Sequence, residues 1–469
     1  MTDGLSGRAA AVLPVAPGWL SVPAGLIAAG AVLRYAPLDP GAARMLAITL
    51  FCVALWIGTP VDPWFTALVG IGLIGVGFSA ELALFGFQSP ATWLVVVGLL
   101  VGEAATASGL GGLIERLTVT RMPDRIATDA VSVYRYLLVV LSVGSLALAV
   151  LVPSSLVRVL ILAPILRSVG ELFDDRQAKI GIFLGPLFAT YYGAAGVLTG
   201  SLANIIVVGL VESGGGPAIT WTAWALWMGP VMGIGRTALV VAVTYLLYRP
   251  SDRDGITVPD TTGSVTPSPR EKRMLAFLLV GVAIWATDFV HGLHPLFGAV
   301  VVALLAFAPR IGVIDHGAIG ETDFSIIFFL GAIFAIAEGL QRTAFTDLAA
   351  NTLLSYLPAD PSLPLVLVFV TFVSIALTFV MEGLAVASVV TPVFVSFATT
   401  AGVPLVPVAM IEAAALSGYF FPYQSAVLVA ILGLDVVDSV ELSRMASACT
   451  VATLLVLLPI QIGLFVLVF

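Results

Sequence analysis

The sequence predicts an all-α polytopic membrane protein with about eleven transmembrane helices and two re-entrant hairpins, arranged as two inverted repeats. Three observations support this prediction. Hydrophobic residues occupy 59% of the 469 positions and charged residues only 10%, whereas a soluble domain carries about 25% charged residues. Apolar runs of membrane-spanning length recur along the whole chain, and its two halves resemble each other. Lipid is therefore the expected solvent.

Each apolar run is about 17 to 25 residues long, the length an α-helix needs to cross roughly 30 Å of hydrocarbon. Pro, Gly and charged residues mark the breaks between runs. The candidate spans begin near Trp19, Met45, Trp64, Thr92, Tyr136, Ile182, Trp224, Met274, Leu296, Phe324, Leu365, Leu405 and Ala446.

Composition also excludes several classes of protein. The net charge of -8 is spread over loops without a run of like charges, so no nucleic acid partner is expected. Cys52 and Cys449 lie in apolar runs and predict neither a disulfide nor a metal site. No HExxH, GxSxG or glycine-rich phosphate loop is present, so no enzyme is expected. Residues 1–8 precede no cleavage site and predict no signal peptide.

The chain divides into four parts. Residues 1–43 form an N-terminal region with an additional transmembrane helix, and residues 44–248 form the first repeat. A polar linker, rich in Ser, Thr, Pro and charge, covers residues 249–272. Residues 273–469 form the second repeat.

The repeat rests on matched residues. RMLA at 44–47 recurs at 273–276, and a tryptophan follows each copy at the same spacing, at Trp56 and Trp285. Further matches follow in order: Glu103 with Glu338, and Pro164 with Pro392. The alternative is that apolar helices resemble each other by composition alone. An odd number of crossings per half inverts one copy, and inverted repeats place a binding site at their interface near the bilayer midplane.

Two hairpin tips and two broken helices are candidates for that site. The tips lie near 153–156 and 381–384, and the breaks lie near 193–213 and 405–434. Irregular backbone at membrane depth is tolerated where it lines a cavity or is buried in protein. Broken helices expose half-helix N-termini that favour an anion, while freed carbonyls can hold Na⁺.

From these segments we predict two overlapping sets of site residues. The substrate-binding set is Ser154, Ser155, Arg158, Asn204, Glu382, Gly383, Gln424 and Ser425. The cation-coupling set, with Na⁺ as the one candidate metal at the first hairpin tip, is Ser154, Gly200, Asn204 and Glu382. No other cofactor is expected.

Two charged residues leave alternatives open. Arg158, inside an apolar run, suits a substrate carboxylate or sulfate, but it could instead pair with Glu382 or snorkel to an interface. Glu382 is a proton carrier, a Na⁺ ligand or the partner of Arg158. The first role is possible because loss of water favours the protonated form of a carboxyl.

Glu412, in a further apolar run, is less readily assigned a structural role than Glu103 and Glu338, which lie near helix ends. Tyr191, Tyr192 and Tyr423 border the breaks, where interfacial belts or core packing explain such residues more often than ligand contact does.

The motifs resemble those of a known family. Ser154 to Pro164 and Glu382 to Pro392 keep the spacing between tip motif and proline of the divalent anion/sodium symporter family. PSSLVR at 153–158 and LTGSLAN at 198–204 are most similar to PSNTAR and LTGMAAN of its 2-oxoglutarate/malate and citrate/succinate antiporter branch. The resemblance implies dicarboxylate, citrate or sulfate transport, a scaffold domain, a moving transport domain with elevator-type alternating access, and a homodimer.

The second site departs from the family pattern. EGL at 382–384 stands where Ser-Asn-Thr is usual, and PYQS at 422–425 replaces Thr-Pro-Pro-Asn. We therefore expect a multi-pass secondary transporter of a small anion in the cell (inner) membrane, coupled to Na⁺ or H⁺ or working by exchange. The alternatives are an ion channel, or a membrane scaffold or receptor subunit without transport.

Overall fold

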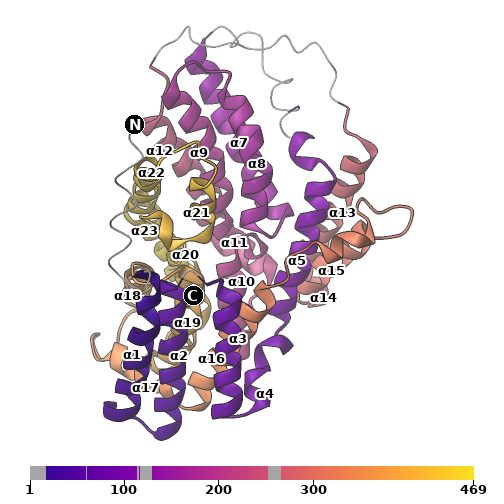
Figure 1. Ribbon diagram of the computed structural model, residues 1–469. Helices are drawn as coiled ribbons and strands as arrows, with labels where there is room; N and C mark the ends of the chain where they lie inside the picture. The colour runs from indigo at the N-terminus through magenta and orange to yellow at the C-terminus, as the bar shows by residue number, and fades with distance from the viewer. Residues whose placement is uncertain (1–16, 60, 114–115, 117–128, 252–265) are drawn as a thin grey trace, which may run out of the picture.

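The computed structural model describes residues 17–59, 61–113, 116, 129–251 and 266–469, and the regular elements of these residues are helices (Figure 1). The predictions for residues 1–16 and for most of the polar linker, 252–265, fall outside the described residues. Among the described helices, six are long and apolar enough to cross a membrane, or seven if one bent pair counts as a single span. The all-α polytopic class is confirmed, and the count of eleven spans stays a prediction.

The helices of the first half begin close to the predicted starts. Three of them open on proline, whose missing N–H is one of the donors that a first helical turn leaves unpaired. The helices before the first tip are α1 (Ser21–Tyr35), α2 (Pro40–Gly58), α3 (Pro63–Gly77), α4 (Ala80–Ala83) and α5 (Pro90–Ala107). From the first hairpin onward they are α7 (Ala130–Leu151), α8 (Ser155–Gly170), α9 (Arg176–Tyr192), α10 (Leu202–Ser213), α11 (Trp221–Met228) and α12 (Arg236–Leu247).

The second half follows a similar order. Its helices are α13 (Pro269–Ala286), α14 (Asp288–His291), α15 (Pro295–Ala306), α16 (Ile326–Arg342), α17 (Phe345–Leu354), α18 (Leu363–Thr378), α19 (Gly383–Ala401), α20 (Leu405–Ala415), α21 (Ala426–Leu432), α22 (Ser439–Ala452) and α23 (Leu458–Val468). Short π-helical turns, η6 (Gly229–Gly235) and η9 (Thr453–Leu457), connect α11 to α12 and α22 to α23.

The first hairpin is longer than the apolar run that predicted it. The run begins at Tyr136, whereas α7 begins at Ala130, because the Asp129 carboxylate caps the helix by accepting from the backbone N–H of Ser132 at 3.1 Å. A capping side chain satisfies donors that the first turn leaves free. Hydropathy detects the apolar part of such a helix and misses its polar first turn.

Equivalent residues of the two halves make equivalent hydrogen bonds. The indole N–H of Trp56 donates to the carbonyl of Pro63 at 3.1 Å, and that of Trp285 donates to the carbonyl of Pro295 at 2.8 Å. The tryptophans thus tie the end of α2 to the start of α3 and the end of α13 to the start of α15. The sequence match at these positions therefore reflects a shared local structure.

The arginines of the two RMLA copies also correspond. The Arg44 guanidinium donates to the carbonyl of Gly77 at the end of α3, at 3.3 Å, and Arg273 donates to the carbonyl of Ile311 after α15, at 2.8 Å. A cation near carbonyls at a helix C-terminus satisfies groups that the helix leaves unpaired.

Packing between the halves is reciprocal. Helix α3 packs against α16, while α15 packs against α5, and α10 packs against α19, while α21 packs against α8. Figure 1 shows α13 to α15 beside α5 on one flank. Such crossed pairs are expected of two copies related by a pseudo-two-fold axis. Their inverted orientation across a membrane remains a prediction.

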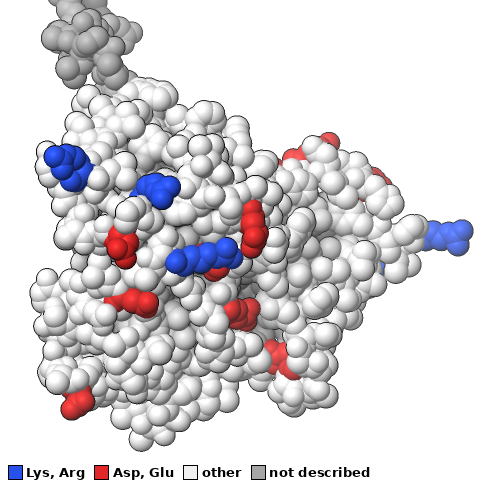
Figure 2. All heavy atoms as spheres, turned by 90° about the horizontal axis from the view of Figure 1, so that it is seen from below, with Lys and Arg blue, Asp and Glu red and all other residues white. Residues whose placement is uncertain are grey.

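The surface is poor in charge. Figure 2 shows a face on which acidic and basic side chains are few, with one basic side chain lying beside acidic ones near its centre. Large apolar side chains are exposed instead, including Val76 at 92% and Leu467 at 85%. Exposure of this kind fits a surface solvated by lipid tails.

The contact between Gly196 in the first break and Gly233 in η6 can be tested by adding a methyl group. A Cβ at Gly196 would lie 2.4 Å from both the Cα and the N of Gly233 in η6, and overpacking of this kind costs about 1–3 kcal/mol. We expect Gly196→Ala to lower the thermal unfolding temperature in detergent. Gly30→Ala is the control, because a Cβ there meets nothing within 4 Å. Equal stability of the two variants would contradict the close contact.

Candidate functional site

The first hairpin tip connects α7 to α8. Ser154 is the N-cap of α8, and its hydroxyl accepts from the backbone N–H of Val157 at 3.4 Å. Ser155, the first residue of α8, is buried and donates to the carbonyl of Gly200 at 3.2 Å. The tip is therefore attached to the first broken helix, and the partial positive charge of the α8 N-terminus lies beside it.

Arg158 forms the main connection between the tip and the break. Its Nε donates to the Thr190 hydroxyl at 2.9 Å, and one terminal nitrogen donates to the carbonyl of Val152 at 2.6 Å. The other terminal nitrogen donates to the carbonyl of Gly200 at 2.8 Å, to that of Thr190 at 3.0 Å and to the Ser155 hydroxyl at 3.0 Å. The guanidinium thus gathers carbonyls at the ends of α7 and α9 and at the break.

These contacts decide between the alternatives for Arg158. The side chain is 0% exposed, so it does not snorkel to an interface. Its hydrogen-bond partners include no carboxylate, and the Glu382 carboxylate instead accepts from the backbone N–H of Leu384 at 2.9 Å. The pairing of Arg158 with Glu382 is therefore not formed in this conformation. Arg158 brings a fixed positive charge to the site while its nitrogens bind protein oxygens.

Asn204 lies at the start of α10 and organises the first break. Its side-chain nitrogen donates to the carbonyl of Val197 at 2.8 Å and to that of Ala194 at 3.1 Å. The amide oxygen consequently faces the other way, and it is buried without a partner among the described residues. Unpaired buried acceptors are unfavourable, so this oxygen is a candidate ligand atom. The Gly200 carbonyl, by contrast, already accepts from Arg158 and Ser155.

At the second tip a carboxylate takes the place of the serine. Glu382 is the N-cap of α19 and is half-buried. It satisfies the α19 N-terminus with its own negative charge. Gly383 follows it, and a Cβ there would lie 2.8 Å from the carbonyl oxygen of Leu416. The tip thus approaches the second break so closely that only glycine fits without a shift.

Gln424 ties the second break to the second hairpin. Its side-chain oxygen accepts from the backbone N–H of Phe420 at 2.6 Å and of Phe421 at 2.8 Å, and its nitrogen donates to the carbonyl of Thr378 at 2.9 Å. Gln424 is 0% exposed. Gln424 therefore pairs buried polar backbone groups at the second break, as Arg158 and Asn204 do at the first.

The two half-sites meet through tyrosines. The Tyr191 hydroxyl, at the end of α9, is hydrogen-bonded to the hydroxyl of Ser425. The rings of Tyr191 and Tyr419 are stacked, with centroids 5.5 Å apart and planes at 6°. Sequence reasoning treated Tyr191 as a packing residue and did not single out Tyr419. Tyr423, by contrast, is exposed and donates to the carbonyl of Phe379 at 3.0 Å.

Sequence reasoning also missed Arg236, at the start of α12. It is 1% exposed, donates to the hydroxyl of Ser417 at 2.8 Å and to its carbonyl at 3.1 Å, and lies over the Tyr192 ring at 4.8 Å. Its position inside the apolar run 221–247 is the same signal that identified Arg158. Applied to this run, that signal could have found it.

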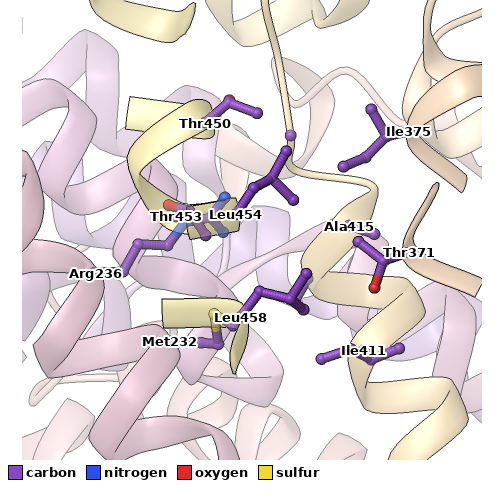
Figure 3. A pocket seen from close by; sticks show the side chains of 12 residues that line it. Met232, Arg236, Thr371, Ile375, Ile411, Ala415, Thr450, Thr453, Leu454 and Leu458 are labelled. Atoms are coloured by element: carbon purple, nitrogen blue, oxygen red, sulfur yellow. The ribbon is translucent and has the colours of Figure 1, made fainter. Parts of the chain in front are cut away.

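A cavity lies beside Arg236 (Figure 3). Mostly apolar side chains line it, among them Ile375, Ile411 and Leu454, together with Thr371, Thr450 and Thr453. None of the predicted site residues contributes to its wall. We therefore do not identify this cavity with the predicted anion site.

The structure thus brings the predicted residues together in two groups. Ser154, Ser155, Arg158, Gly200 and Asn204 surround the first tip and break, and Glu382, Gly383, Gln424 and Ser425 surround the second. The contact between Tyr191 and Ser425 joins the groups. This arrangement supplies helix N-termini, hydroxyls and one fixed cation, which can bind an anion through hydrogen bonds and charge. Among the described residues no three His, Cys, Asp or Glu side chains gather into a metal cluster.

Comparison with known proteins gives consistent results. The family model described as "Sodium:sulfate symporter transmembrane region" matches residues 27–468. An "L-tartrate/succinate antiporter" of Shigella boydii is 27% identical over 349 residues, which cover 66% of this chain and 69% of that protein. The protein of the same name from Escherichia coli strain UTI89 is 26% identical over the same length. The crystal structure of the Alcanivorax borkumensis YdaH transporter shares the fold, with a TM-score of 0.53 and 14% identity, over 91% of this chain and 98% of that one.

The role of Arg158 can be tested by a substitution that keeps its charge. Lysine has one nitrogen with three donors and cannot reproduce the planar fork. Because hydrogen bonds from a charged donor contribute about 1.5–3 kcal/mol each, we expect Arg158→Lys to lower stability and to speed amide hydrogen exchange across residues 193–204. Arg135→Lys is the control, because Arg135 is exposed and bonded to the Tyr245 hydroxyl. Unchanged exchange in 193–204 would contradict the proposed connection.

Proposed function

This chain belongs to the sodium:sulfate symporter family, and from that premise we propose that it exchanges one small dicarboxylate for another across the cell membrane. It is a multi-pass transporter of small anions in the cell (inner) membrane, and not an enzyme. The choice of dicarboxylates is supported by the relatives named L-tartrate/succinate antiporters. The choice of exchange is supported by the first half-site.

The proposal of exchange rests on the burial and position of Arg158. A transporter of anions needs positive charge near its substrate, supplied either by a co-transported cation or by the protein. Arg158 supplies it permanently, at 0% exposure and next to the N-terminus of α8. A binding site that carries its own positive charge is costly to move across hydrocarbon when it is empty. It can therefore return to the other side of the membrane only after it has bound another anion.

The same contacts disfavour Na⁺ at the first tip. Carbonyl and hydroxyl oxygens are suitable ligands for Na⁺, but the Gly200 carbonyl and the Ser155 hydroxyl already accept hydrogen bonds from Arg158. A cation there would lie against the guanidinium and be repelled by it. The unpaired oxygen of Asn204 then accepts a hydrogen bond from a substrate hydroxyl or from water. We propose that Na⁺ is not required.

In this proposal the anion lies between the two tips. One carboxylate faces the N-terminus of α8 and the hydroxyl of Ser154, and the rest of the molecule faces Glu382, Tyr419 and Ser425. The helices of each hairpin and break move together past the remaining helices, as the elevator mechanism requires. The hydrogen bonds made by Arg158 and Gln424 support this, since each joins a hairpin to its neighbouring broken helix.

Exchange can be measured with labelled succinate in proteoliposomes. We expect several-fold faster uptake into vesicles preloaded with unlabelled succinate than into empty vesicles, and the same rate when external Na⁺ is replaced by choline. Vesicles without protein give the background. Uptake that requires an inward Na⁺ gradient would mean symport. If folded protein exchanges neither succinate nor tartrate, the dicarboxylate assignment is wrong.

We also propose that the transporter is a homodimer, as the family resemblance implies. Light scattering with detergent correction should give a protein mass twice the 48.7 kDa of one chain. Dilution over the accessible range should leave that mass unchanged if the interface is apolar and stable. A mass equal to one chain in mild detergent, with exchange retained in liposomes, would contradict the dimer.

A further inference from the structure

Glu412 is a buried carboxyl that the exchange mechanism does not use. It lies in the middle of α20 and is 1% exposed. One carboxyl oxygen accepts from the hydroxyl of Thr391 at 2.6 Å. The other is buried and has no partner among the described residues. Helix α19 supplies Thr391, so this hydrogen bond joins α19 to α20.

No described cation compensates this carboxyl. The helices packed closely against α20 are α10, α18 and α19. Helix α18 carries no charged residue, Glu212 lies near the end of α10 and faces His294 at 3.7 Å, and Glu382 precedes α19. Arg236 lies near the end of α20, but its two terminal nitrogens donate to Ser417 and Tyr192, and no contact joins it to Glu412 among the described residues.

The direction of the side chain explains this isolation. Successive residues of an α-helix are turned by about 100°. Ile411 and Ala415 face the cavity beside Arg236 (Figure 3), so Glu412 points away from that cavity and toward α19. An ionised carboxylate buried without a cation is strongly unfavourable, and such a group takes up a proton instead. A proton on the unpaired oxygen makes the carboxyl neutral and leaves the Thr391 hydrogen bond in place.

Glu412 is also connected to the second half-site. Helix α19 begins at Glu382 and Gly383, and α20 runs directly into Ser417 and the second break. A change of charge at the contact between α19 and α20 therefore acts on both elements that form this half-site. Ionised Glu412 would require water or a cation at the contact, but Glu412 is 1% exposed and no described cation lies beside it.

We propose that Glu412 is a proton-binding site that must be occupied for anion exchange. The proposal rests on the anion transport function proposed above. Glu412 keeps its proton while the site crosses in either direction, so the contact between α19 and α20 stays neutral and closed, and no net proton crosses with the exchanged anions. Thr391 positions the carboxyl.

The test measures protons and anions in the same proteoliposomes. Labelled succinate reports anion entry, pyranine inside the vesicles reports internal pH, and valinomycin with K⁺ holds the voltage. For wild type, succinate entry into vesicles preloaded with succinate should leave the internal pH unchanged and should slow several-fold as the pH on both sides rises, because an ionised Glu412 stops the movement of the site. Glu412→Gln, which cannot ionise, should lose this pH dependence. Glu81→Gln, at a 76% exposed carboxylate, is the control and should retain it.

Infrared difference spectroscopy provides a second readout that needs no transport. We expect a protonated-carboxyl band in wild type near neutral pH that is missing in Glu412→Gln and shifted in Thr391→Val, which loses the hydroxyl donor. A spectrum of Glu412→Gln without this loss would overturn the bound proton. Exchange by Glu412→Gln that slows with rising pH as wild type does would overturn the requirement for the proton. If wild type exchanges no anion while the band is present, the proposed transport function fails and the bound proton stands.

Discussion

Polar backbone in the interior must find partners inside the protein, and the arrangement of this site follows from that requirement. Two helices are broken between α9 and α10 and between α20 and α21, so carbonyls and N–H groups are freed where lipid or packed protein offers no water. Arg158, Asn204 and Gln424 satisfy them with donors and acceptors from their side chains. Each of these residues is at most 1% exposed. Without them the breaks would leave unpaired groups, and the hairpins would lose their attachment.

The two half-sites meet this requirement with different chemistry. At the first, a guanidinium binds carbonyls, and the helix N-terminus is capped by the uncharged hydroxyl of Ser154. At the second, an amide binds the backbone, and Glu382 brings a carboxylate of its own to the helix N-terminus. The halves are therefore similar in backbone and opposite in charge.

Buried charge is distributed unevenly over the helices. Arg158 and Arg236 bind carbonyls near helix C-termini, where the partial negative charge of the helix compensates a cation. Glu412 has no such arrangement and rests on a single hydroxyl. Positive charge is thus held in place by backbone, while the buried carboxyl of Glu412 depends on a proton. This asymmetry suits a transporter that binds a negatively charged substrate and a single proton.

The sequence by itself determined the all-α polytopic class, because hydropathy and span length depend on composition along the chain and not on contacts. It also located Arg158 and Glu382, since a charge inside an apolar run is visible without a structure, although Arg236 shows that this signal was not applied everywhere. The roles of these residues were decided by tertiary structure. Whether Arg158 binds Glu382, a substrate or carbonyls depends on Val152, Thr190 and Gly200, and two of these lie more than thirty positions away. The stacking of Tyr191 on Tyr419 and the isolation of Glu412 likewise arise only when distant helices pack, because partners and burial are properties of the folded chain.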